Sequence, residues 1–121
     1  MHETRWLDDE QRTIYIEFAG NWDALEFIET ERQLYKLLSK VGHQVAVILN
    51  LTEARPLTMD LVRQLRDLLS TDHPNRGEVV LVTLPDYQPA FGEVVRRALG
   101  GKLPGYIHLV DELEQVESWL A

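Results

Sequence analysis

The residues of this chain best suited to chemistry are its histidines and a run of acids near the N-terminus. The four histidines are dispersed, with none of the short spacings by which histidines share a metal ion: His2, His43, His73 and His108. The acidic run at residues 8–10 has no second set of ligands beside it, which favours a polar hairpin turn over a cation site. The sequence therefore predicts no metal site and no cofactor.

Nucleophiles and phosphate-binding loops also lack their usual context. Ser39, Ser70 and Ser118 lie on or near predicted helix ends, without the strand-to-helix turn that activates a serine. Gly100-Gly101 follows a predicted helix, whereas a phosphate-binding loop would precede one. We therefore predict no catalytic residue and a protein that is not an enzyme. An active site without a known motif is the least favoured alternative.

Composition limits the class of protein. The chain has 121 residues, which suits a single domain spanning residues 1–121, and its net charge of -8 disfavours nucleic acid as a partner. Cysteine is absent, which excludes disulfides and favours a cytoplasmic location. The N-terminal residues do not resemble an export signal, and no apolar segment approaches membrane-spanning length. We expect neither export nor a membrane span.

Strand and helix patterns alternate along the chain. Strands are predicted at residues 4–7, 13–19, 45–49, 79–84 and 106–110, the first two forming a hairpin. Helices are predicted from Asp23 to a left-handed stop at Gly42, after Thr58, at residues 89–99 and from Asp111. The first helix carries apolar residues at helical spacing: Ala24, Phe27, Ile28, Leu34, Tyr35, Leu38 and Val41. The expected fold is α/β, with a mixed, mostly parallel sheet of about five strands and four main helices.

Three segments of this pattern point to a known family. Gly20-Asn21-Trp22-Asp23-Ala24 joins a strand to a capped helix, Val47-Ile48-Leu49-Asn50-Leu51 forms a central strand, and Asp111-Glu112-Leu113 follows the last strand. Together with the element order, these segments resemble a STAS domain of the anti-sigma factor antagonist type over nearly the whole chain. The resemblance implies a signalling or regulatory module that works by binding a protein, such as an anti-sigma factor or a related kinase-like regulator.

The chain departs from the family at the turn that carries the regulatory phosphoserine. Ungapped counting from Asn50 places Thr58-Met59-Asp60-Leu61 over that turn, with Met59 at the serine position. The usual serine phosphoswitch is therefore expected to be missing. A shift of one residue makes Thr58 an alternative phosphoacceptor, whereas its ordinary role is to cap the helix.

The resemblance also implies where a partner binds. The expected surface is the loop after the central strand and the helix that follows it. Arg63 and Arg66 lie three residues apart on that helix, opposite its leucines. The predicted partner-binding residues are Glu53, Arg55, Thr58, Met59, Asp60, Arg63 and Arg66.

A second class of function stays open on sequence grounds. Aromatic residues and a histidine gather in the C-terminal third, and they could line a pocket for a small molecule or a lipid: Tyr87, Phe91, Tyr106 and His108. The sequence also leaves homodimerisation open. A polar pocket would favour a ligand, whereas a filled core beside an exposed helix would favour a protein partner.

Overall fold

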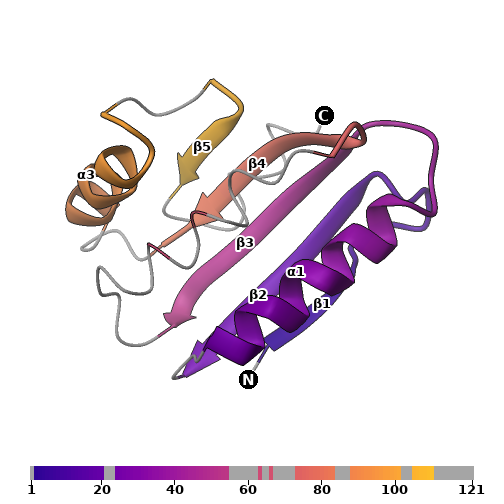
Figure 1. The fold of residues 1–121 in the computed structure, drawn as a ribbon, viewed down its shortest axis with the longest axis horizontal. Coiled ribbons are helices and arrows are strands. Elements are labelled where there is room, and N and C mark those ends of the chain that lie inside the picture. Colours follow the sequence, from indigo (N-terminus) through magenta and orange to yellow (C-terminus); the bar gives the residue numbers. More distant parts are fainter. Residues whose placement is uncertain are drawn as a thin grey trace.

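The computed structural model describes residues 2–20, 24–54, 63, 66, 73–83, 88–101 and 105–110. These residues form an α/β structure built on one five-stranded sheet (Figure 1). The strands lie side by side in chain order: β1 (His2–Trp6), β2 (Thr13–Gly20), β3 (Val45–Ala54), β4 (Arg76–Val82) and β5 (Ile107–Val110). β1 pairs with β2 antiparallel, and all the other pairs are parallel. The predicted hairpin and the mixed, mostly parallel sheet are confirmed.

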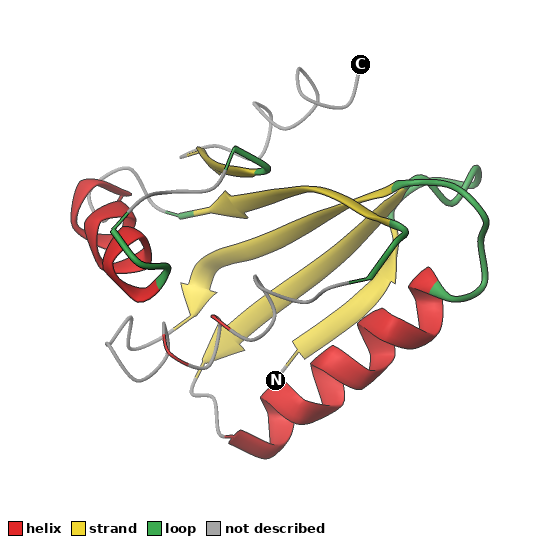
Figure 2. Ribbon diagram, turned by 45° about the horizontal axis from the view of Figure 1, so that its top comes forward, coloured by secondary structure: helices red, strands yellow, loops and turns green. Residues whose placement is uncertain are grey.

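Two helices, α1 (Ala24–Leu38) and α3 (Gln88–Ala98), cover one face of this sheet (Figure 2). Phe27, Leu34 and Leu38 of α1 belong to the same buried cluster as Val95 of α3. Four helices were predicted. The other two, after Thr58 and from Asp111, lie outside the described residues, except that the backbone is helical at Arg63 and Arg66.

The core has two parts, one on each face of the sheet. On the helix-covered face, side chains that alternate along β2, β3, β4 and β5 are buried against α1 and α3: Ile14, Ile16, Phe18, Val47, Leu49, Leu51, Val79, Leu81 and Ile107. The intervening positions form a smaller cluster on the opposite face: Tyr15, Ile48, Val80, Val82 and Val110. Because β3 and β4 are apolar on both faces, their sequences read as continuous apolar runs.

The acidic run near the N-terminus forms the turn between β1 and β2. The Asp8 carboxylate accepts hydrogen bonds from the backbone N–H groups of Arg12, at 3.1 Å, and Thr13, at 3.0 Å. Gln11, within the turn, has a left-handed backbone with φ of 58°. The Asp8 side chain therefore satisfies free backbone N–H groups of this turn, as a capping residue does at the start of a helix.

The end of α1 corrects one prediction. The predicted left-handed stop at Gly42 is wrong, because α1 ends at Leu38 and Gly42 has no positive φ. A residue distant in sequence terminates the helix. The Asn75 amide donates to the backbone carbonyls of Leu38, at 2.9 Å, and Val41, at 2.8 Å. The carbonyl of the last helical residue and a carbonyl of the loop that follows are thus paired with the segment leading into β4.

The end of α3 follows its prediction. Gly100 and Gly101 have φ values of 91° and 99°. The Gly101 N–H donates to the Arg96 carbonyl at 2.9 Å, and the Gly100 N–H donates to the Arg97 carbonyl at 3.3 Å. This pair of hydrogen bonds is a Schellman motif, which favours glycine because of its left-handed backbone.

Candidate functional site

The predicted partner surface begins where β2 and β3 end. Glu53 pairs in register with Ala19 of β2, just after a register shift between Glu17 and Ala19. Its side chain is exposed. Gly20, the last residue of β2, has a φ of 74°, which lets the chain leave the sheet at this edge. The carboxyl edge of the two strands therefore presents the Glu53 carboxylate to solvent.

Two of the predicted arginines are described, and both are exposed. Arg63 and Arg66 both have helical backbones. Because Arg63 and Arg66 are three residues apart, helical geometry puts their guanidinium groups on neighbouring parts of one surface. The other predicted partner-binding residues lie outside the described residues: Arg55, Thr58, Met59 and Asp60.

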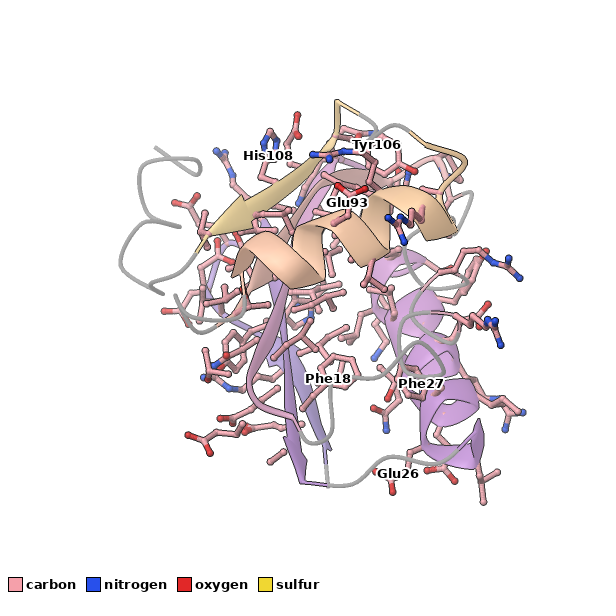
Figure 3. The ribbon with its side chains drawn as sticks, turned by 90° about the vertical axis from the view of Figure 1, so that its left-hand side faces the viewer. Phe18, Glu26, Phe27, Glu93, Tyr106 and His108 are labelled. Carbon is pink, nitrogen blue, oxygen red and sulfur yellow. The ribbon has the colours of Figure 1, made fainter. Side chains whose placement is uncertain are left out.

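The structure does not bring together the two described aromatic-pocket candidates. Tyr106 packs against the core of the helix-covered face, with the Arg76 guanidinium 4.3 Å from its ring centroid. His108 points to the other side of β5 (Figure 3), where its Nε2 lies 2.6 Å from a Glu78 carboxylate oxygen. Tyr106 precedes β5, so the alternation of side chains along that strand does not place it on the same face as His108. Tyr87 lies outside the described residues, as does the side chain of Phe91.

An exposed apolar pair on α1 was missed by the sequence analysis. Leu25 is 63% exposed, and Ile28, one of the apolar residues noted at helical spacing, is 52% exposed. The buried side of α1 is instead formed by Phe27, Thr30, Leu34 and Leu38. The position of Ile28 relative to Phe27 in the sequence already indicated that its side chain is exposed. Ile28 is one residue away from Phe27, which on a helix turns it about 100° from the core-facing stripe.

Behind the carboxyl edge lies a buried polar network. Asn50 is 8% exposed and Tyr15 is 6% exposed, and the Asn50 amide donates to the Tyr15 hydroxyl at 2.8 Å. The Asn50 carbonyl oxygen accepts from the Thr52 backbone N–H, at 3.1 Å, and from the Thr52 hydroxyl, at 2.8 Å. These bonds fix the last residues of β3 just before Glu53. Asn50 therefore has a structural role at the end of β3.

The opposite, amino edge of the sheet carries an open hollow of about 400 Å³. It is lined by Glu10, Arg12, His43 and Gln44. Most of their polar groups already have partners within the chain. Arg12 pairs with Glu10 at 3.2 Å, and the His43 Nε2–H donates to the Gln11 carbonyl at 2.8 Å. These contacts tie the β1–β2 turn to the segment before β3.

The remaining chemistry-bearing residues act within the fold. The His73 Nδ1 accepts from the Asn75 backbone N–H at 3.0 Å, and its ring packs edge-on against Tyr35. Among the described residues, no three histidines, aspartates or glutamates are grouped so that they could hold a metal ion. The same residues contain no helix that is long and apolar enough to cross a membrane.

Comparison with known proteins identifies no family for this chain. No protein-family model matches the sequence, and no curated protein was found to match it.

Proposed function

We propose that this chain is a STAS-like, cytoplasmic protein-binding module that acts without catalysis. Its partner is an anti-sigma factor or a related kinase-like regulator. The partner contacts the carboxyl edge of β3 and the helical surface that carries Arg63 and Arg66. The observation that carries the proposal is the exposure of Glu53, Arg63 and Arg66 in the positions that the family resemblance gives to a partner surface.

The fold supports this proposal in two ways. The antiparallel hairpin followed by parallel strands, with α1 and α3 on one face, agrees with the element order that suggested the family. The described candidates for an aromatic pocket, Tyr106 and His108, are occupied by separate contacts with Arg76 and Glu78. A protein partner on an exposed charged surface is therefore favoured over a small molecule in the C-terminal third.

Reversing both exposed arginines is expected to weaken partner binding at least tenfold. In the Arg63→Glu/Arg66→Glu variant, two attractive charges become repulsive toward an acidic partner, and loss of steering also slows association. Both side chains are exposed, so the midpoint of thermal unfolding should move little. Calorimetric titration against purified anti-sigma-factor kinases of the same cell measures the affinity, and thermal unfolding measures the stability.

The matched control is Arg12→Glu/Arg97→Glu, which changes net charge by the same amount. The Arg12 and Arg97 side chains are 72% and 73% exposed and lie on other parts of the molecule. This control should bind almost as wild type does. If no kinase-type regulator binds, or if both double variants lose affinity equally, the proposed surface is wrong.

The proposal includes the absence of the family's serine switch. A phosphoryl group adds up to about two negative charges, which would repel an acidic partner, but the position of the serine is occupied by Met59. Incubation with the kinase-type partner and ATP should leave the intact mass unchanged. Peptide mapping that finds stoichiometric phosphate on Thr58, together with loss of affinity, would restore the switch with threonine as its acceptor.

A further inference from the structure

The first strand of the chain is an edge of the sheet. Among the described residues, β1 pairs only with β2, and no described element lies beyond its outer side (Figure 1). The register of this pairing is regular from His2 to Trp6. The strand thus contains neither a bulge nor a proline, two of the devices that keep an edge strand from pairing with another chain. Its outer side can therefore accept a further strand.

The backbone groups on the outer side of β1 belong to alternate residues. The Leu7 N–H donates to the Thr13 carbonyl at 2.8 Å, which marks these two residues as a hydrogen-bonded pair that continues the β1–β2 ladder. Because hydrogen-bonded and non-hydrogen-bonded pairs alternate along an antiparallel ladder, Glu3 and Arg5 are the residues of β1 that bond to β2. The residues whose backbone N–H and C=O groups point outward are therefore His2, Thr4 and Trp6.

The side chains of Glu3 and Arg5 lie on the face of the sheet away from α1. The Arg5 guanidinium is 4.9 Å from the centroid of the Tyr15 ring, and Tyr15 belongs to the buried cluster on that face. The two side chains are about half exposed, Glu3 at 55% and Arg5 at 47%, and they form an ion pair of 3.1 Å within the strand. Charged side chains ordinarily protect an edge, but a strand that carries the complementary charges is attracted by them.

β1 carries the complementary charges for a second copy of itself. When two copies of β1 run antiparallel with Thr4 opposite Thr4, Glu3 of each copy is opposite Arg5 of the other. The same register pairs the outward groups of Thr4 with each other and those of His2 with those of Trp6. Glu3 and Arg5 then occupy non-hydrogen-bonded positions, where opposite side chains are closest. Sliding the strands by two residues would instead place Glu3 opposite Glu3 or Arg5 opposite Arg5. Charge and hydrogen bonding thus select the same two-fold register.

We propose that this chain forms a homodimer in which the two β1 strands pair antiparallel about Thr4 and join the two sheets into one. Because β1 has only five residues, we expect a contact smaller than the roughly 1,200 Å² that stable interfaces bury, and hence a weak dimer. The net charge of -8 opposes association at low salt, but at physiological salt charges more than about 8 Å apart are largely screened. The dimer is independent of the proposed function, because it uses none of the proposed partner-binding residues.

Two oppositely charged variants test the register. Glu3→Arg and Arg5→Glu each place like charges opposite each other in their own homodimer, so each should associate at least tenfold more weakly than wild type. An equimolar mixture should regain association, because the arginines of one variant then face the glutamates of the other at both positions. The ion pair within the strand cannot explain such a recovery, because both variants lack it. Sedimentation equilibrium of the untagged full chain at physiological ionic strength measures the dissociation constants.

A backbone variant tests the outward hydrogen bonds. Thr4→Pro removes an N–H that points outward and none that bonds to β2, so it should weaken the dimer at least tenfold while the midpoint of thermal unfolding moves little. Thr4→Val is the matched control, because it keeps the N–H and should associate as wild type does. Circular dichroism checks that each variant is folded. If Thr4→Pro does not fold, the mixture of the two charge variants decides the question.

Three outcomes would overturn the inference. The first is a wild-type chain that stays monomeric at every concentration that can be reached. The second is a mixture of the two charge variants that associates no more tightly than either variant alone. The third is a dimer that Thr4→Pro leaves intact but that Leu25→Ser/Ile28→Ser dissociates, because the contact would then lie on the exposed apolar pair of α1.

Discussion

Replacing Phe18 by alanine is expected to lower the free energy of unfolding by about 3–5 kcal/mol, the usual loss for a buried phenylalanine. Phe18 is fully buried and is among the largest fully buried side chains of the described residues. Its ring centroid lies 5.7 Å from that of Phe27, and Figure 3 shows the two rings between β2 and α1. The substitution leaves a cavity in the core between the sheet and α1. Denaturant unfolding monitored by circular dichroism measures the loss.

Ile28→Ala is the matched control, because it truncates an apolar residue on the same helix where the side chain is half exposed. Its cost should be at most about 1 kcal/mol, since little of this side chain is removed from water in the fold. A double-mutant cycle of Phe18→Ala and Phe27→Ala should show a coupling of about 0.5–1.5 kcal/mol from the ring pair. Equal losses for Phe18→Ala and Ile28→Ala would contradict the assignment of the core.

The sheet was the most predictable part of the fold. Alternating Ile14, Ile16 and Phe18 identify one buried face of β2, and the unbroken apolar run at residues 45–49 identifies β3 as covered on both faces. Strand boundaries were less accurate. β3 continues through Thr52 to Ala54, and β4 begins at Arg76 instead of residue 79. In both segments, pairing with a neighbouring strand extends the element beyond its apolar residues.

Long-range hydrogen bonds explain why the predicted end of α1 was wrong. The sequence offered Gly42 as a local stop signal, but the helix ends four residues earlier, where Asn75 pairs with the carbonyl of Leu38, its last residue. No local pattern around Leu38 contains this information, because the capping residue follows in the chain only after β3 and the segment between β3 and β4. At α3, by contrast, Gly100 and Gly101 cap the helix locally, and the prediction succeeded.

The candidate site was predictable only where a residue's exposure follows from its position on one element. Arg63 and Arg66 were expected to be exposed because they lie opposite the leucines of their helix, and both are. His108 and Tyr106 were grouped by the alternation of a strand, but Tyr106 lies before β5 and turns toward Arg76. The exposure of Leu25 and Ile28 was not predicted: Leu25 was not considered, and Ile28 was grouped with the apolar residues at helical spacing although it follows the buried Phe27 directly.

The second large effect on stability is expected when the Asn50 amide is removed. Asn50→Ala should lower the free energy of unfolding by about 2–4 kcal/mol, because a buried group that loses its partner costs about 1–3 kcal/mol beyond the lost bonds. The change removes the donor to the Tyr15 hydroxyl and the acceptor for both Thr52 groups. Tyr15 is also held from outside the network by Arg5, whose guanidinium lies 4.9 Å from the ring centroid. Tyr15 is only 6% exposed, so water cannot readily replace the lost partner of its hydroxyl.

Two further variants identify the network as the cause. Asn50→Asp keeps an oxygen that accepts from Thr52, and the Tyr15 hydroxyl can rotate to donate to the carboxylate, so the loss should be smaller than for Asn50→Ala. Tyr15→Phe should cost about 1–2 kcal/mol, because it leaves the Asn50 amide with one bond fewer. The double variant Tyr15→Phe/Asn50→Ala should be less destabilised than the sum of its parts, because both single variants break the same hydrogen bond. Strict additivity in denaturant unfolding would show that Tyr15 and Asn50 act independently, in which case only the bonds between Asn50 and Thr52 tie this side chain to the end of β3.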